Sequence, residues 1–169
     1  MILTTVCAAL LCLLAASFGD AESDELQNFA FVIGEWEGVF HLHPSSIQPN
    51  PVETPAVMAS RWGPNHSWIE TDSTMELPSL GMYAVKVIVR FDISRNMYDS
   101  FVVNTFGNGA RYSGVRDGNK LVFTGEVGKI TQRVTYELLS ENEMSFRVEH
   151  SQDGNHFVPH SDIMWHRKK

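Results

Sequence analysis

The stretch GEWEG at residues 34–38 marks the point at which the hydrophobic pattern of the chain changes. Before it, residues 25–33 carry apolar side chains at helical spacing, which predicts one short amphipathic helix ending at Gly34, with an irregular lead-in as the alternative. After it, apolar and polar side chains alternate with a period of two, which is typical of β-strands with one buried face. The stretch therefore separates a short N-terminal helix from a long run of strands.

Ten segments have the alternation expected of strands, and short turns separate them. They are residues 36–42, 57–62, 67–77, 82–91, 97–106, 110–116, 121–127, 131–139, 144–151 and 157–167. Residues 44–55 hold four prolines and are expected to form a loop. The regular spacing predicts an all-β fold, a single antiparallel closed β-barrel of about ten strands, with a sandwich as the alternative.

The first residues of the chain are expected to direct export. Residues 6–14 form an unbroken apolar run that is too short to span a bilayer as a helix, and small residues follow it. Residues 1–19 are therefore predicted to be a signal peptide, cleaved after residue 19 or 21, and residues 22–169 to be the barrel domain. Cys7 and Cys12 both lie in the predicted signal, so the domain would contain no disulfide. The predicted localisation is secreted or periplasmic.

Charge and composition narrow the range of partners. The net charge is −7, and the 13 basic residues are scattered rather than gathered in a stripe. This pattern argues against a nucleic-acid partner. No stable membrane insertion is expected, and the predicted oligomeric state is a monomer or weak dimer. Asn65-His66-Ser67 matches the N-glycosylation sequon, which has meaning only in a eukaryotic secretory pathway.

The alternation also indicates which side chains point into the barrel. In several strands charged residues alternate with apolar ones, so a one-residue shift in register would bury the charges. The predicted ligand-binding lining consists of Ile69, Thr71, Met75, Tyr83, Val85, Val87, Val89, Val134, Tyr136, Phe146 and His150. Thr71, Tyr136 and His150 could orient a polar group of the ligand. A packed core whose hydroxyls bond to the backbone is the alternative to a cavity.

Several stretches resemble known families of small barrels. GEWEG at residues 34–38 is similar to the start of calycin-type barrels, which include lipocalins, fatty-acid-binding proteins and nitrobindin-like haem barrels. FDISRNMY at 91–98, YSGVRDGNKL at 112–121, and DGN at 153–155 ahead of MWHR at 164–167 resemble a mostly bacterial family known as domain of unknown function 1579. The resemblance implies a ten-stranded lipocalin-like barrel and gives little guidance on activity.

The same resemblance and the chemistry of two residues predict how one end of the barrel is closed. Trp36 would close the floor with a large apolar ring. Arg167 would lie over its face, in a cation–π contact worth about 0.5–2 kcal/mol. The short helix is expected to cover the same end, so the expected role of this pair is structural.

Two of the seven histidines, His41 and His43, share one face of the first strand. This spacing is acceptable for a metal site. Because side chains alternate between the two faces of a strand, however, they lie on the face opposite to Trp36, which is the outer face. They are therefore expected to be solvated surface residues, and no metal site is predicted.

The late strands hold the remaining candidates for chemistry. His150 continues an inward-pointing series, whereas His160 shares one face of the last strand with Asp162 and His166. The residues on the opposite face are Phe157, Ile163 and Trp165. These apolar side chains favour that opposite face as the inward one. The resemblance to nitrobindin-like barrels implies His160, with His150 as the alternative, as an axial haem ligand.

The motifs of common enzymes are missing from the sequence. It has no nucleophile elbow, phosphate-binding loop or His-Glu-x-x-His. The leading hypothesis is therefore an exported barrel, without catalysis or cofactor, that binds a small apolar or amphipathic molecule. The first alternative is a haem- or metal-binding barrel with redox or isomerase chemistry. The second is a packed barrel that acts through its outer surface as an interaction module.

Overall fold

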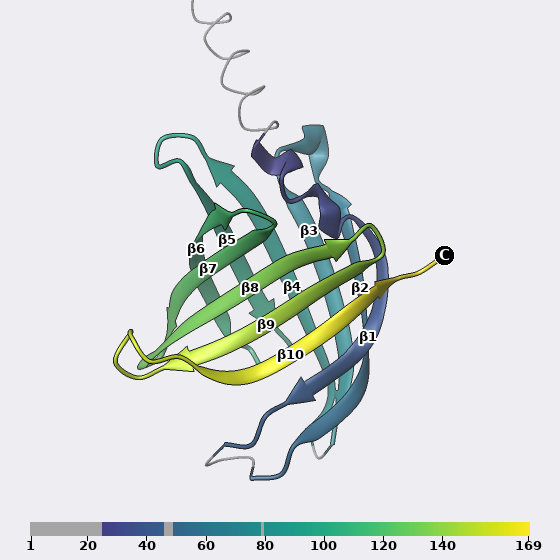
Figure 1. The fold of residues 1–169 in the computed structure, drawn as a ribbon, viewed down its shortest axis with the longest axis vertical. Coiled ribbons are helices and arrows are strands. Elements are labelled where there is room, and N and C mark those ends of the chain that lie inside the picture. The colour runs from purple at the N-terminus through teal and green to yellow at the C-terminus, as the bar shows by residue number, and fades with distance from the viewer. Residues whose placement is uncertain (1–24, 46–48, 79) are drawn as a thin grey trace, which may run out of the picture.

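The chain folds as a ten-stranded antiparallel β-barrel (Figure 1). The structure is a computed structural model that describes residues 25–45, 49–78 and 80–169, so the predicted signal peptide lies outside it. The strands are β1 Gly34–Leu42, β2 Val52–Trp62, β3 Ile69–Leu77, β4 Gly81–Asp92, β5 Met97–Asn104, β6 Gly109–Asp117, β7 Lys120–Val127, β8 Ile130–Ser140, β9 Glu143–Ser151 and β10 Val158–Arg167. The predicted all-β fold is confirmed.

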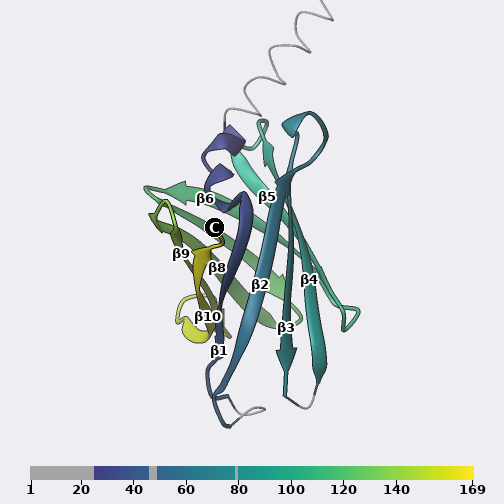
Figure 2. The same cartoon turned by 90° about the vertical axis from the view of Figure 1, so that its right-hand side faces the viewer.

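The barrel is closed by pairing of its first and last strands. Each strand pairs with the next in the chain, and β1 also pairs with β10, so none of the described strands has a free edge. We call the end covered by residues 25–33 the closed end (Figure 2). The opposite end, where the connections after β1, β3, β5, β7 and β9 lie, we call the open end. Within the described part of the chain, no helix has the length and apolar character needed to cross a membrane.

The N-terminal segment covers the closed end, but not as the single helix that its spacing predicted. It forms one turn of α-helix followed by the 3-10 helix η1, Ala30–Val32. Leu26, Phe29 and Val32 are its buried residues, each at most 1% exposed. Their spacing of three matches the three residues per turn of a 3-10 helix, which explains why this segment winds tightly.

Arg167 ties the N-terminal segment to the barrel. Its guanidinium carbon lies 4.1 Å from the centre of the Trp36 ring, as expected from the sequence. Nη1 donates to the carbonyl oxygen of Ile33 at 2.5 Å, and Nη2 donates to that of Phe31 at 3.0 Å. Nε donates to the carbonyl oxygen of Glu141 at 2.9 Å. The side chain of Arg167 thus joins the N-terminal segment, Trp36 and the β8–β9 turn.

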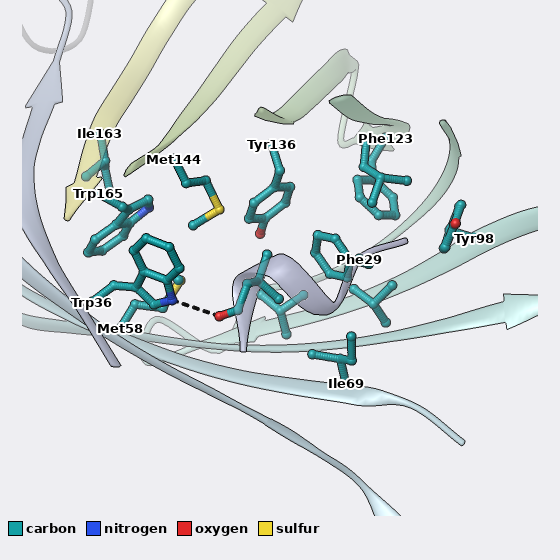
Figure 3. Packing of buried hydrophobic residues seen from close by; sticks show 14 of the residues in the cluster. Phe29, Trp36, Met58, Ile69, Tyr98, Phe123, Tyr136, Met144, Ile163 and Trp165 are labelled. Atoms are coloured by element: carbon teal, nitrogen blue, oxygen red, sulfur yellow. Dashed lines mark hydrogen bonds between the residues drawn. The ribbon is translucent and has the colours of Figure 1, made fainter. Parts of the chain in front are cut away.

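A cluster of large buried side chains fills the closed end (Figure 3). Trp36 is fully buried, and its indole nitrogen donates to the carbonyl oxygen of Val32 at 2.8 Å. Phe29 packs edge-on against Tyr136, with ring centres 5.3 Å apart. Trp165 is 2% exposed, and its indole N–H has no hydrogen-bond partner among the described residues. Large side chains from the lead-in and from several strands therefore fill this end.

Strand β2 begins earlier than the proline content suggested. The loop predicted for residues 44–55 was wrong at its end, because β2 already starts at Val52. Pro55 pairs with Val39 of β1, whereas pairing with β3 starts only at Ala56. A proline lacks the N–H that a ladder needs, and this one stands where no described β3 residue pairs with it.

A β-bulge in β10 changes which side chains of the last strand point inward. The register with β9 shifts between Pro159 and Ser161. His160 and Ser161 both line the interior as a result, whereas Asp162 is on the outside. The prediction that His160 shares a face with Asp162 and His166 was therefore wrong. A bulge adds one residue to one strand and so reverses the alternation on which the prediction depended.

Phe157 is also not where the alternation placed it. Its ring lies 4.0 Å from the guanidinium carbon of Arg133. Arg133 in turn makes an ion pair with Glu149 at 2.8 Å, between neighbouring strands. Phe157 precedes the bulge and therefore packs against this ion pair on the outside of the barrel.

Candidate ligand-binding cavity

A cavity of about 310 Å³ occupies the barrel interior between the closed-end core and the open end. Its size is at the lower limit of pockets that hold small molecules. Most of its lining is apolar and comes from strands all around the barrel. The apolar residues are Phe40, Met58, Met75, Val85, Val87, Val102, Ala110, Phe123, Val127, Val134, Phe146, Val148, Ile163 and Trp165. A molecule in this cavity would contact apolar surface on every side.

Most of the residues predicted as lining are at the cavity wall. Those that line it are Met75, Tyr83, Val85, Val87, Val134, Tyr136 and Phe146. The four that do not line it are Ile69, Thr71, Val89 and His150. All four come from strands that contribute other residues to the wall. The inward face of each strand was therefore predicted correctly. The four residues lie above or below the cavity along the barrel axis.

The first three of these residues belong to the packed part of the core. Ile69, Thr71 and Val89 are 0%, 4% and 1% exposed, respectively. The hydroxyl of Thr71 lies 2.8 Å from that of Ser60, so it already has a partner within the protein. Their placement in the cavity lining was wrong, because a period of two gives the inward face of a strand but not the level at which packing gives way to a cavity.

Four polar side chains form a continuous row across β6 to β10, which we call the polar row: Tyr112, Gln132, His150 and His160. The hydroxyl of Tyr112 donates to Oε1 of Gln132. Nε2 of Gln132 lies 2.7 Å from Nε2 of His150. Because an amide NH₂ only donates, this ring nitrogen accepts the bond and His150 carries its proton on Nδ1. His150 and His160 are stacked, with ring centres 3.9 Å apart.

A glycine makes the polar row possible. Tyr112 is on β6 and Gln132 is on β8, so the tyrosine ring must cross the intervening strand β7. It crosses at Gly125, where an added Cβ would be 2.7 Å from Cδ1 of Tyr112 and 2.5 Å from the carbonyl oxygen of Arg111. Such contacts are too short for a side chain. Gly125 is therefore required for the close approach of the tyrosine to the sheet.

The histidines of the polar row are held in their neutral form. Burial, with the neighbouring His150 and His43, lowers the pKa of His160 to about 4. Burial also lowers the pKa of His150. On the outer side, His43 lies 2.6 Å from Asp162, and its backbone N–H donates to the carbonyl oxygen of His160. Near neutral pH, His160 therefore presents an uncharged ring to the cavity.

Lowering the pH from 7.5 to 5 is expected to destabilise the protein, and His160→Gln is expected to reduce this loss. His160 has an ordinary pKa of 6.5 and a pKa of about 4 in the folded state. As the pH falls between these values, the unfolded chain takes up the proton first, so stability is lost in this window. Thermal unfolding at both pH values measures the effect. The control is His66→Gln, at an exposed position outside the cavity, which should leave the loss of stability between the two pH values as in the wild type. An equal loss in His160→Gln and the wild type would contradict the assignment.

Three tyrosines, Tyr112 and Tyr136 buried and Tyr83 partly buried, also contribute to the polar part of the lining. Burial raises the pKa of Tyr83, and a hydrogen bond with Asn104 partly offsets this rise. Burial raises the pKa of Tyr112 to about 12 and also that of Tyr136. All three phenols are therefore protonated near neutral pH.

Sequence reasoning missed Tyr112 and Gln132 as members of the site. Tyr112 could have been predicted from the alternation of side chains along β6, because it lies on the same face as Ala110, which also lines the cavity. Gln132 had a weaker signal, because it stands at an inward position two residues before Val134 and polar residues were not expected there. His160 was considered as an interior residue and as a haem ligand, but the apolar residues on the opposite face of its strand argued against it, and the bulge that turns it inward has no clear mark in the sequence.

Each of the outer-face histidines lies beside a carboxylate of a neighbouring strand. Nδ1 of His41 lies 3.2 Å from a carboxylate oxygen of Glu53 on β2. His43 pairs with Asp162 of β10. Among the residues that the structure describes, no group of three or more His, Cys, Asp or Glu side chains is arranged to hold a metal ion.

The closed meander of ten strands, its covered end and its internal cavity define a calycin-like β-barrel. The chain is similar to the crystal structure of Rv2717c from M. tuberculosis, with a TM-score of 0.63 and 13% identity over 85% of this chain and 97% of that one. It is also similar to the S-type phycobiliprotein lyase CPES from Guillardia theta, with a TM-score of 0.59 and 9% identity over 90% of this chain and 98% of that one. These identities show a common fold alone.

Comparison at the level of sequence gives no family. No family model matches the chain, and no curated protein matches it. The resemblance to domain of unknown function 1579 is therefore not confirmed, whereas the calycin-like fold is.

Proposed function

We propose that this protein is an exported barrel that binds one small apolar or amphipathic molecule in its interior. The observation that carries the proposal is the cavity of about 310 Å³ with a mostly apolar wall. Export rests on the predicted signal peptide, and the likeness in fold to a phycobiliprotein lyase is in keeping with a barrel that handles a small molecule. The barrel would act by burial, without a reaction and without a cofactor.

Burial of apolar surface supplies enough free energy for such binding. Removing about 200 Å² of ligand surface from water would contribute about 5 kcal/mol at 25 cal/mol per Å². The wall is built on strands and is preformed, so little is lost in ordering it. Stacked and edge-on aromatic rings such as Tyr83 with Phe106 and Tyr136 with Phe146 keep the wall in place.

Filling the cavity is expected to abolish binding while preserving the fold. Val134→Trp places a large ring inside, and Val102→Phe does the same from another part of the wall. Either change should weaken the binding of an apolar fluorescent dye by at least about tenfold, because the dye would lose its space. The control is Val115→Trp, at an outward position that is 49% exposed. Circular dichroism and thermal unfolding show whether each variant is folded.

Wild-type affinity in both folded cavity variants would show that the dye binds elsewhere and would refute an interior site. Native mass spectrometry of protein purified from its own host would then identify any retained ligand. A protein that binds neither dye nor host molecules would instead favour a barrel that acts through its outer surface.

A haem-binding barrel is the second candidate, and His160 is the observation that favours it. Its ring lines the cavity and is uncharged near neutral pH, as an axial ligand must be. None of the described lysines and arginines lines the cavity, so the haem carboxylates would have to reach solvent at the open end. Titration with haem tests this proposal. A Soret band that His160→Ala removes and His41→Ala keeps would support it, and equal spectra of the two variants would refute it.

A further inference from the structure

The described wall of the cavity carries no formal charge. None of the described residues that line it is Asp, Glu, Lys or Arg. Its titratable members are Tyr83, Tyr112, Tyr136 and His160, and burial shifts the pKa of each one in the direction that keeps it neutral. An ion brought into this space would lose its hydration without gaining a counter-charge, which costs several kcal/mol. The wall therefore selects against charged ligands.

Several polar groups at the wall already have partners in the protein. Tyr112 and Gln132 bond to each other in the polar row. Tyr83 bonds to Asn104. Groups that are paired in this way hold the wall together and contribute little to recognition. The indole N–H of Trp165, also at the wall, has no partner among the described residues, and groups of this kind indicate what the cavity would accept.

The hydroxyl of Tyr136 is such a group. Tyr136 is 8% exposed, lines the cavity, and accepts or donates no hydrogen bond through its side chain among the described residues. Three aromatic rings fix its position edge-on: Phe29 at 5.3 Å, Phe146 at 5.0 Å and Phe123 at 6.1 Å between ring centres. Figure 3 shows the hydroxyl pointing away from β8 into the barrel interior.

The surroundings of this hydroxyl keep it protonated, so it can donate a hydrogen bond to a ligand. Burial and the neighbouring Tyr112 raise the pKa of Tyr136, so the phenol keeps its proton. Ser100 and Ser161 add two buried hydroxyls at the same wall, 5% and 3% exposed as residues. A serine hydroxyl can bond to a backbone carbonyl of its own strand, whereas the tyrosine hydroxyl stands too far from its own backbone to do so. This hydroxyl can gain a hydrogen bond only from a molecule in the cavity, and such a bond contributes about 0.5–1.5 kcal/mol net.

We propose that the ligand is an uncharged, mostly apolar molecule that places one acceptor oxygen, such as a ketone, ester or ether oxygen, against the hydroxyl of Tyr136. The proposal rests on the proposed interior binding and specifies its ligand class. The apolar wall takes up the remainder of the molecule. The ketone oxygen satisfies a donor that an apolar ligand leaves unpaired, and a charged head group finds no partner among the described residues of the wall.

Four ligands of similar size test the proposal in a dye-displacement assay at pH 7.5. They are benzylacetone, butylbenzene, phenylpropanesulfonate and phenylpropyl trimethylammonium. Benzylacetone should bind about tenfold more tightly than butylbenzene, which corresponds to one hydrogen bond of about 1.4 kcal/mol. Both charged compounds should bind at least tenfold more weakly than benzylacetone.

The variant Tyr136→Phe keeps the ring and removes only the hydroxyl. It should bind butylbenzene as the wild type does and lose the preference for benzylacetone. The matched control is Tyr98→Phe, because the Tyr98 hydroxyl donates to the carbonyl oxygen of Glu25 at 2.9 Å and does not line the cavity. This control should keep the preference.

The outcomes separate this inference from the function on which it rests. If none of the four compounds displaces the dye in the wild type, interior binding itself is refuted. If butylbenzene binds and benzylacetone binds no better, or if Tyr136→Phe keeps the preference, interior binding stands and the role of Tyr136 is overturned. Equal binding of the sulfonate and benzylacetone would overturn the selection against charge.

Discussion

Replacing Arg167 with methionine is expected to lower the free energy of unfolding by about 3 kcal/mol and the melting temperature by roughly 6–12 °C. The guanidinium lies 4.1 Å from the centre of the Trp36 ring and donates to three backbone carbonyl oxygens. Methionine keeps much of the apolar stem but leaves these carbonyls without their donor. Chemical denaturation monitored by tryptophan fluorescence measures the change.

Two further variants separate geometry from charge. Arg167→Lys keeps the positive charge but cannot replace the planar fork of donors, so most of the loss should remain. Arg147→Met alters an exposed arginine on the neighbouring strand β9 and should change stability by no more than about 0.5 kcal/mol. Similar effects of Arg167→Met and Arg147→Met would show that Arg167 does not join the segment to the barrel.

Truncating Phe29 to alanine is expected to lower the free energy of unfolding by about 3–5 kcal/mol, more than the loss expected for Arg167→Met. Phe29 is 1% exposed and packs against Phe31, Phe123 and Tyr136 at the closed end. Its removal leaves an empty volume that the strands, held by their ladders, cannot collapse to fill. Thermal and chemical unfolding report the loss.

The same change is expected to alter the cavity. Tyr136 lies at the cavity wall and on the other side contacts Phe29, so the space left by Phe29 adjoins the cavity. A bulkier dye should then bind relatively better to Phe29→Ala than to the wild type. Phe31→Ala, at a partly exposed position of the same segment, is the control and should cost less than half as much. Equal losses from the two variants would show that the segment acts only as a loose cover.

Most of the strands could be predicted from the sequence because they obey one local rule, the alternation of apolar and polar side chains. In β8, for example, Arg133 and Glu137 must face water while Val134 and Tyr136 face inward, and a shifted register would bury the charges. The pair of Trp36 and Arg167 was predicted from the resemblance to calycin-type barrels, and the affinity of a guanidinium for an indole face supported it. The strands are thus specified by patterns that extend over a few residues each.

The features that escaped prediction depend on contacts between distant segments. The bulge at His160 arises in the fit of β10 to β9, and nothing in the local alternation indicates it. The crossing of Tyr112 over Gly125 requires knowledge of which strands are neighbours. Ile69 and Val89 were given the correct face and the wrong level, because the level depends on how far the N-terminal segment reaches into the barrel.

The pairing of β1 with β10 has a consequence for biosynthesis. The partner of the first strand is Val158–Arg167, so the two sides of the seam are separated by more than a hundred residues of chain. Contacts of such long sequence separation form slowly, because the loop between them must be closed first. The hydrophobic floor around Trp36 stays exposed on the nascent chain until Trp165 and Arg167 have been synthesised. Closure of the seam is therefore a late step in folding, and chains that have not yet reached it expose apolar surface through which they can aggregate.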